Sequence, residues 1–209
     1  MNELALIGLQ ILFIIFIFNF SVYEITNKIK IKYLNIFEIM SVNILFLLNI
    51  LLFLSILNLT INYIFLIIIS LTLLGFVKDI KNKKYELIKN INFIIIFFIL
   101  SFIISIDLAS SIDLGWDAKI FGFFKTLNFY QNNNLGNLIN LNVKDYPHLG
   151  SFLWSLLWKF PFNYNEYFGR ISFVVIYLIS IFSFYYDLKI NKTAKLIFIF
   201  LTILITYEY

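Results

Sequence analysis

The sequence contains no cysteine, a single histidine and only two prolines among its 209 residues. Without cysteine there is no disulfide framework and no thiolate metal site, and one histidine excludes any metal site that needs two imidazoles. Charged residues are also scarce, at 13% of the chain, whereas an ordinary soluble domain carries about 25%. These shortages exclude a disulfide-rich secreted domain and a nucleic-acid-binding module.

Apolar residues take the place of the missing charge. The chain is 61% hydrophobic and 20% aromatic, with 26 phenylalanines, and its mean hydropathy is +0.90. A soluble domain is nearer 45–50% apolar, so this composition excludes a disordered chain and a water-soluble enzyme of ordinary composition. The composition indicates a membrane protein. Because a bilayer satisfies no open strand edge, the many isoleucines and phenylalanines are predicted to form helices rather than strands.

Six apolar runs have the composition of membrane-spanning helices, which need about 20 mostly apolar residues. The runs are residues 4–23, 36–57, 61–77, 91–106, 169–186 and 194–207. The first run has no basic segment before it and no small-residue cleavage site after it, so we expect it to remain as a membrane anchor. The sequence therefore predicts an all-α, polytopic transmembrane helix bundle of about six spans.

The basic residues predict how the runs are oriented. Most of the 16 lysines and arginines lie in three connections between runs, whereas residues 58–62 include none. The basic residues of these connections are Lys28, Lys30, Lys32, Lys78, Lys81, Lys83, Lys84, Lys89, Lys189, Lys192 and Lys195. Lysine-rich loops stay in the cytoplasm, which predicts an outside N-terminus and an external segment over residues 107–168. The richness in Ile, Asn, Lys and Phe is typical of an AT-rich bacterial genome, so we expect a bacterial inner membrane.

One further apolar stretch, residues 148–160, is too short to span a membrane. Its thirteen residues give about 20 Å of helix, against a hydrocarbon core of about 30 Å. Its polar members recur at intervals of three and four, so they lie on one helix face. These members are His148, Ser151, Ser155 and Lys159. We expect a juxtamembrane helix that lies at the outer interface.

The predicted external segment, residues 107–168, holds most of the chain's unusual residues. It contains all three tryptophans, both prolines and the histidine, and an insertion of this length between spans is long enough to be functional. Its aspartates Asp117 and Asp145 lie near basic side chains that could face a phosphate. These basic residues are Lys119, Lys125, His148, Lys159 and Arg170. Both aspartates also suit the N-caps of interfacial helices, and the residues alone leave the two interpretations open.

Three short elements follow one another between residues 116 and 170. The first is Trp-Asp-Ala at residues 116–118, with Phe121 after it. The second is Tyr-Pro-His-Leu-Gly at residues 146–150, and the third is Glu166 with Arg170 at the start of the next apolar run. In order and spacing they resemble the integral-membrane GT-C glycosyltransferases, in particular the branch of protein O-mannosyltransferases and aminoarabinose-lipid transferases.

The resemblance implies an enzyme that moves a sugar from a polyprenyl-phosphate-linked donor to an acceptor on the outer membrane face. It implies that Asp117 is the general base, a role that contributes on the order of 10²–10⁴ in rate. The residues that it implies for binding the donor and acceptor are Trp116, Lys119, Asp145, His148, Glu166 and Arg170. The implied partners are the lipid-linked donor and the bilayer, with no nucleic acid.

The chain departs from the family at three points. Ala118 stands where many members carry a second acid, so no cofactor is assigned and a divalent metal is without support. Residues 1–90 form a three-span N-terminal extension, and residues 91–209 resemble only the N-terminal core of the family, so further spans are expected beyond Tyr209. The alternative is a non-catalytic or truncated GT-C-like protein that acts as a scaffold or lipid-sugar binder. A channel or transporter is disfavoured because no run has an ionisable residue at its middle.

Overall fold

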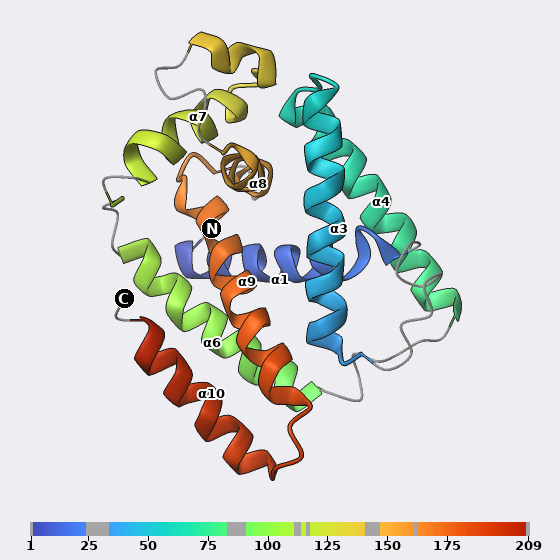
Figure 1. Cartoon of the computed structure of the whole chain (residues 1–209), viewed down its shortest axis with the longest axis vertical. Helices are drawn as coiled ribbons and strands as arrows, with labels where there is room; N and C mark the ends of the chain where they lie inside the picture. The colour runs from blue at the N-terminus through green and yellow to red at the C-terminus, as the bar shows by residue number, and fades with distance from the viewer. Residues whose placement is uncertain are drawn as a thin grey trace.

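Helices make up every regular element that the computed structural model describes (Figure 1). The described residues are 2–23, 34–82, 91–110, 114–115, 118–140, 147–160 and 163–207. Within them, five helices are long and apolar enough to cross a membrane: α1 (Glu3–Phe20), α3 (Ile36–Ile56), α4 (Ile61–Asn82), α6 (Ile91–Ser110) and α9 (Tyr167–Tyr186). The prediction of an all-α polytopic bundle is confirmed, and the protein is a multi-pass membrane protein.

The sixth expected run forms a shorter helix, α10 (Lys192–Tyr207). Its 16 residues extend for about 24 Å, less than the hydrocarbon core of about 30 Å. α10 packs against α9 through a hydrogen bond of 2.7 Å between the hydroxyls of Tyr185 and Thr202. The ring of Tyr185 also stacks on Phe198, with 6.0 Å between centroids.

Four of the long helices, α3, α4, α6 and α9, alternate in direction along the bundle (Figure 1). The start of α3 meets the end of α9, where Nδ2 of Asn35 donates a hydrogen bond of 2.9 Å to Oδ2 of Asp187. Asn35 also forms a capping box with Glu38, which fixes where α3 begins. The turn between α3 and α4 lies at the other end, away from the connection at residues 187–191 that leads into α10.

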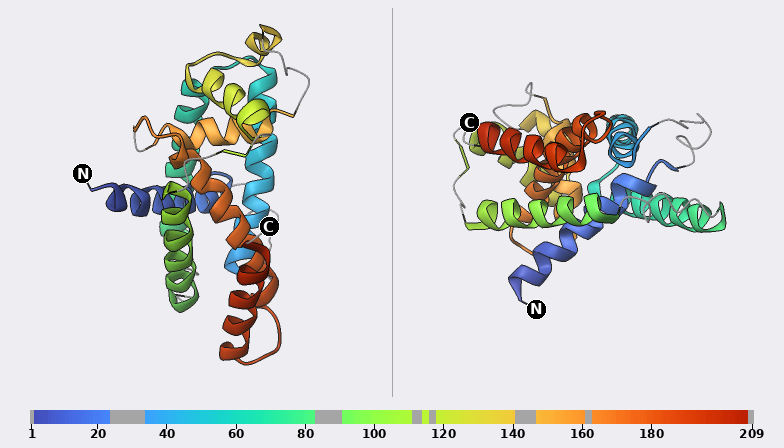
Figure 2. Two further views of the ribbon diagram at one scale, coloured as in Figure 1. Left: turned by 90° about the vertical axis from the view of Figure 1, so that its left-hand side faces the viewer. Right: turned by 90° about the horizontal axis from the view of Figure 1, so that it is seen from below.

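α1 runs across the bundle rather than alongside α3 and α6, as Figure 1 and Figure 2 both show. Near its middle, Nε2 of the buried Gln10 donates hydrogen bonds of 2.7 and 2.9 Å to the carbonyl oxygens of Leu157 and Phe168. At its last residue, a Cβ on Gly75 of α4 would lie 2.2 Å from the Phe20 carbonyl oxygen. A small residue is therefore required where α1 meets α4.

The segment between α6 and α9 folds into short helices at the end of the bundle that holds the α3–α4 turn (Figure 1). They are η1 (Ala118–Phe123), α7 (Phe124–Tyr130), η2 (Leu135–Asn140) and α8 (Leu149–Trp158). We call residues 118–160, as far as the structure describes them, the cap. α8 packs against α7 on one side and against α9, α3 and α4 on others, so the cap is joined to the long helices through α8.

The surroundings of α8 differ from the expected interfacial helix. The helix forms as predicted, but residues 151–158 are all buried within the protein. The polar face meets η1 and α7, since Ser151 donates a hydrogen bond to the Gly122 carbonyl at 3.1 Å and Lys159 donates one to the Tyr130 carbonyl at 2.6 Å. Neighbouring helices therefore cover both the polar and the apolar faces of α8.

The three N-terminal long helices share one hydrophobic core with the rest of the chain. Phe37 of α3, Phe97 of α6 and Phe182 of α9 form an aromatic cluster with centroid distances of 5.0 to 5.4 Å. The predicted division of the chain into residues 1–90 and 91–209 stays a prediction from the sequence, because position 90 lies outside the described residues.

Candidate functional site

The structure describes four of the seven site residues predicted from the sequence. Asp117, Trp116 and Asp145 lie outside the described residues. Lys119 lies in η1 with its side chain exposed. Of the three remaining predicted residues, His148 lies at the start of α8, and Glu166 and Arg170 lie at the start of α9.

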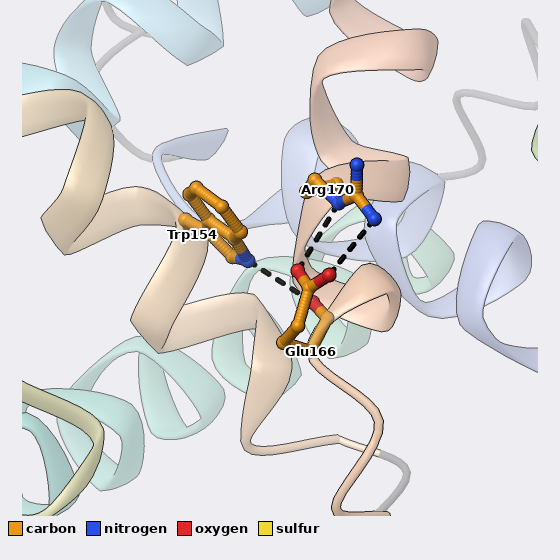
Figure 3. A network of polar contacts seen from close by, with 3 residues as sticks. All are labelled: Trp154, Glu166 and Arg170. Carbon is orange, nitrogen blue, oxygen red and sulfur yellow. Dashed lines mark hydrogen bonds and ion pairs between the residues drawn. The ribbon is translucent and has the colours of Figure 1, made fainter. Parts of the chain in front are cut away.

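Glu166 and Arg170 form a two-point ion pair at the start of α9 (Figure 3). Nε and Nη2 of Arg170 donate to the two carboxylate oxygens at 3.1 and 2.8 Å. The side chains are only 18% and 11% exposed, respectively. Burial raises the pKa of the Glu166 carboxyl, and the Arg170 guanidinium opposes that rise. The two charges are one helical turn apart, as their i, i+4 spacing predicts.

Trp154 of α8 connects this ion pair to the cap. Its Nε1 donates a hydrogen bond of 3.0 Å to the Glu166 carbonyl oxygen (Figure 3). Its ring also contacts Phe123 at the end of η1, with 6.1 Å between centroids. The indole is 5% exposed, so Trp154 is a packing residue and not part of an aromatic belt at the lipid interface.

Lys125 and His148 place a positive charge and a partly buried imidazole in the cap. Lys125 of α7 is fully buried, which is rare for a lysine. Burial lowers the pKa of His148, and the charge of Lys125 lowers it further. Among the described residues, Nε2 of His148 is buried with no hydrogen-bond partner. The imidazole is therefore uncharged at neutral pH and lies within the electrostatic reach of Lys125.

Lys159 has a structural role at the other end of α8. Its Nζ donates to the Tyr130 carbonyl oxygen and lies 4.3 Å from the centroid of the Tyr130 ring. That ring stacks on Trp158 at a centroid distance of 3.9 Å, and Nε1 of Trp158 donates to the Asn163 carbonyl at 3.1 Å. Burial lowers the pKa of Lys159. The lysine joins α7 to α8 instead of extending toward a lipid surface.

Two features of this region were not predicted from the sequence. The complete burial of Lys125 has no local signal, because a lysine between aromatic residues also suits an exposed helix face. Gln10 does have a signal in the sequence, because it is the one polar residue between Leu4 and Phe18 in an apolar run. Such a residue usually finds a partner within the helix bundle, and here the partners are the end of α8 and the start of α9.

No metal centre is found in the part of the chain that the structure describes, where no three His, Cys, Asp or Glu side chains come together. Comparison of the chain with known protein families, with curated proteins and with solved structures gives no match. The resemblance to GT-C glycosyltransferases therefore stays a prediction from the sequence motifs.

The lowered pKa of His148 predicts a pH-dependent stability. The unfolded chain takes up a proton near pH 6.5, where the folded protein does not. As far as His148 is concerned, the free energy of unfolding is therefore highest above pH 6.5. It falls as the pH drops from 6.5 through the lower pKa of the folded state. Thermal unfolding of the detergent-solubilised protein at a series of pH values measures it.

His148→Gln provides the comparison, because the chain has no other histidine. Glutamine cannot titrate, so the variant should lose the part of the pH dependence that lies just below pH 6.5. Equal slopes for the two proteins in this range would show that His148 is as easily protonated in the folded protein as in the unfolded chain.

Proposed function

We propose that the protein transfers a sugar from a polyprenyl-phosphate donor to an acceptor hydroxyl at the outer face of a bacterial inner membrane. The acceptor oxygen forms a bond to the anomeric carbon, and the bond from that carbon to the phosphate oxygen breaks. Asp117 takes the hydroxyl proton, and polyprenyl phosphate leaves with the electron pair. The proposal rests on the sequence motifs together with the charge inside the cap.

The observation that carries the proposal is the buried Lys125 beside the uncharged His148. A leaving phosphate gains negative charge as the bond breaks, and a fixed cation with little water around it stabilises that charge strongly. Lys125 lies in α7, between the Trp-Asp-Ala and Tyr-Pro-His-Leu-Gly motifs in the sequence. The cation and both motifs therefore belong to the same segment between spans.

Arg170 supplies a second positive group near the start of α9. A guanidinium carries five N–H donors, and the pair with Glu166 uses two of them. In the proposal, Glu166 orients the guanidinium, and the remaining donors bind the donor phosphate. A planar guanidinium fits phosphate oxygens in pairs, which suits this role better than the exposed Lys119 does.

The assay for the proposal follows the leaving group. Membranes that contain the protein are incubated with polyprenyl-phosphate donors of several sugars, and the release of polyprenyl phosphate is measured against membranes without it. Release in proportion to the amount of protein supports the transferase.

The alternative, a lipid-sugar binder that does not catalyse transfer, gives a different result in the same experiment. Such a protein would retain the donor on purification but release no polyprenyl phosphate above the background of membranes without it. Donor retention without release would therefore replace the proposed transferase with a binding protein.

A further inference from the structure

A cavity of about 240 Å³ lies between the end of α1, α3 and α4, away from the cap. Its walls include Phe20, Ser21, Ile50, Leu71, Leu74 and Lys78. Apart from the serine and the lysine, these residues are apolar, and Leu71 and Leu74 are exposed at the surface of the bundle. The cavity therefore opens on a surface that lipid chains cover.

The close contact of α1 with α4 forms one wall of the cavity. Gly75 lies between the lining residues Leu74 and Lys78, and the Phe20 carbonyl oxygen comes within 2.2 Å of where its Cβ would be. Next to this contact, the hydroxyl of Ser21 is buried and has no hydrogen-bond partner among the described residues. The end of α1 is thus held against α4, and the cavity lies next to it.

The residues of α4 that line the cavity change from apolar to cationic along the helix. Leu71, Leu74 and Lys78 follow one another at spacings of three and four, so they share one face. Leu71 and Lys78 lie about 10 Å apart along the helix axis, and Lys78 lies near the end of α4 at Asn82. Asp79 is adjacent in sequence but faces another direction, as neighbours in a helix do.

A second positive charge follows on the same helix. Lys81 lies in the last turn of α4, three residues after Lys78. An apolar cavity with a cation toward the membrane surface has the same order of groups as a phospholipid, whose chains lie deeper than its phosphate. Basic pockets between spanning helices are known to bind anionic headgroups.

We propose that this cavity binds an anionic phospholipid, with one acyl chain against Leu71 and Leu74 and the phosphate next to Lys78. The surrounding bilayer supplies the ligand, and the lysine selects a headgroup with net negative charge over a zwitterionic one. The site is independent of the proposed transferase, since it lies outside the cap and takes no part in the reaction.

Native mass spectrometry of the full chain in detergent tests the selection. Phosphatidylglycerol and phosphatidylcholine with identical chains are added in equal amounts, and the bound ratio is measured. One lysine near an anionic headgroup predicts a preference of about fivefold for phosphatidylglycerol. Lys78→Gln should reduce the ratio to about one, whereas Lys189→Gln, an exposed lysine after α9, should leave it unchanged.

A second pair of variants tests the cavity itself. Leu74→Trp fills it and should abolish the retained phosphatidylglycerol, whereas Leu73→Trp changes an exposed neighbour that does not line it. Circular dichroism and gel filtration confirm that the variants fold. The proposal is overturned if Lys78→Gln keeps the preference, if both lipids bind equally to the unmodified chain, if Leu74→Trp and Leu73→Trp bind alike, or if excess inorganic phosphate displaces the lipid.

Discussion

Replacing Asp117 with asparagine should abolish the release of polyprenyl phosphate while the protein continues to accumulate in membranes. An amide cannot take the proton of the acceptor hydroxyl, and loss of a general base costs on the order of 10²–10⁴ in rate. The release assay with equal amounts of the unmodified and Asp117→Asn proteins measures the effect. No other single substitution is expected to have a larger effect on activity.

Asparagine separates the catalytic role from the structural one. Asn and Asp are about equally good N-cap residues, so an Asp117 that only caps a helix would tolerate the change without effect. Asp113→Asn is the matched control, because Asp113 is an aspartate of the same segment to which no role is assigned. Unchanged release by Asp117→Asn, or an equal loss in Asp113→Asn, would remove Asp117 as the base.

Gly169→Ala should cause the largest loss of stability. A Cβ at Gly169 would lie 2.4 Å from both Cδ1 and the carbonyl oxygen of Trp154, and 3.0 Å from Cβ of Trp158. Because one of these atoms belongs to the backbone of α8, a side-chain rotation cannot relieve the contact and the two helices must separate. Overpacking of this kind costs about 1–3 kcal/mol, measured as a lower midpoint of thermal unfolding in detergent.

Gly150→Ala is the control for this prediction, since a Cβ at Gly150 meets no atom within 4 Å. Gly150 is exposed in the first turn of α8, where alanine should be neutral or slightly stabilising because it restricts the unfolded chain. If the two variants unfold at the same temperature, α8 and α9 are not in close contact at Gly169.

The sequence predicts the positions of the long helices well because hydrophobic length is a strong constraint in a bilayer. It predicts their ends less well. The run 61–77 was predicted to end at the first lysine, yet α4 continues to Asn82, because lysine side chains can extend to the surface from the last turns of a helix. In the same way, α6 continues past Asp107 to Ser110.

The environment of α8 shows what a polarity pattern leaves undetermined. The spacing of Ser151, Ser155 and Lys159 correctly places them on one face, but a polar face can meet water, headgroups or another helix. Here it meets η1 and α7, whose carbonyl groups at Gly122 and Tyr130 accept the hydrogen bonds. Those partners are 29 residues away in the sequence, so only the fold identifies them.

The candidate site, too, was predictable from the sequence only in its local contacts. The ion pair of Glu166 and Arg170 follows from their spacing on one helix. The proximity of Lys125 to His148 and the contact of Gln10 with α8 and α9 depend on long-range packing, as the separation of 147 residues between Gln10 and Leu157 illustrates. Nothing in the local sequence specifies such a pair.

The proposed function requires the cap to lie on the outer face of the membrane, where the proposed donor would be used, and this location is the central claim. The chain has no cysteine, so single cysteines report their position without a background signal. Gln131→Cys, exposed after α7, and Lys189→Cys, exposed after α9, are treated in intact cells with a membrane-impermeant maleimide. We predict labelling of Gln131→Cys in intact cells and of Lys189→Cys only after permeabilisation. The reverse pattern, or labelling of both positions from the same side, would contradict the account.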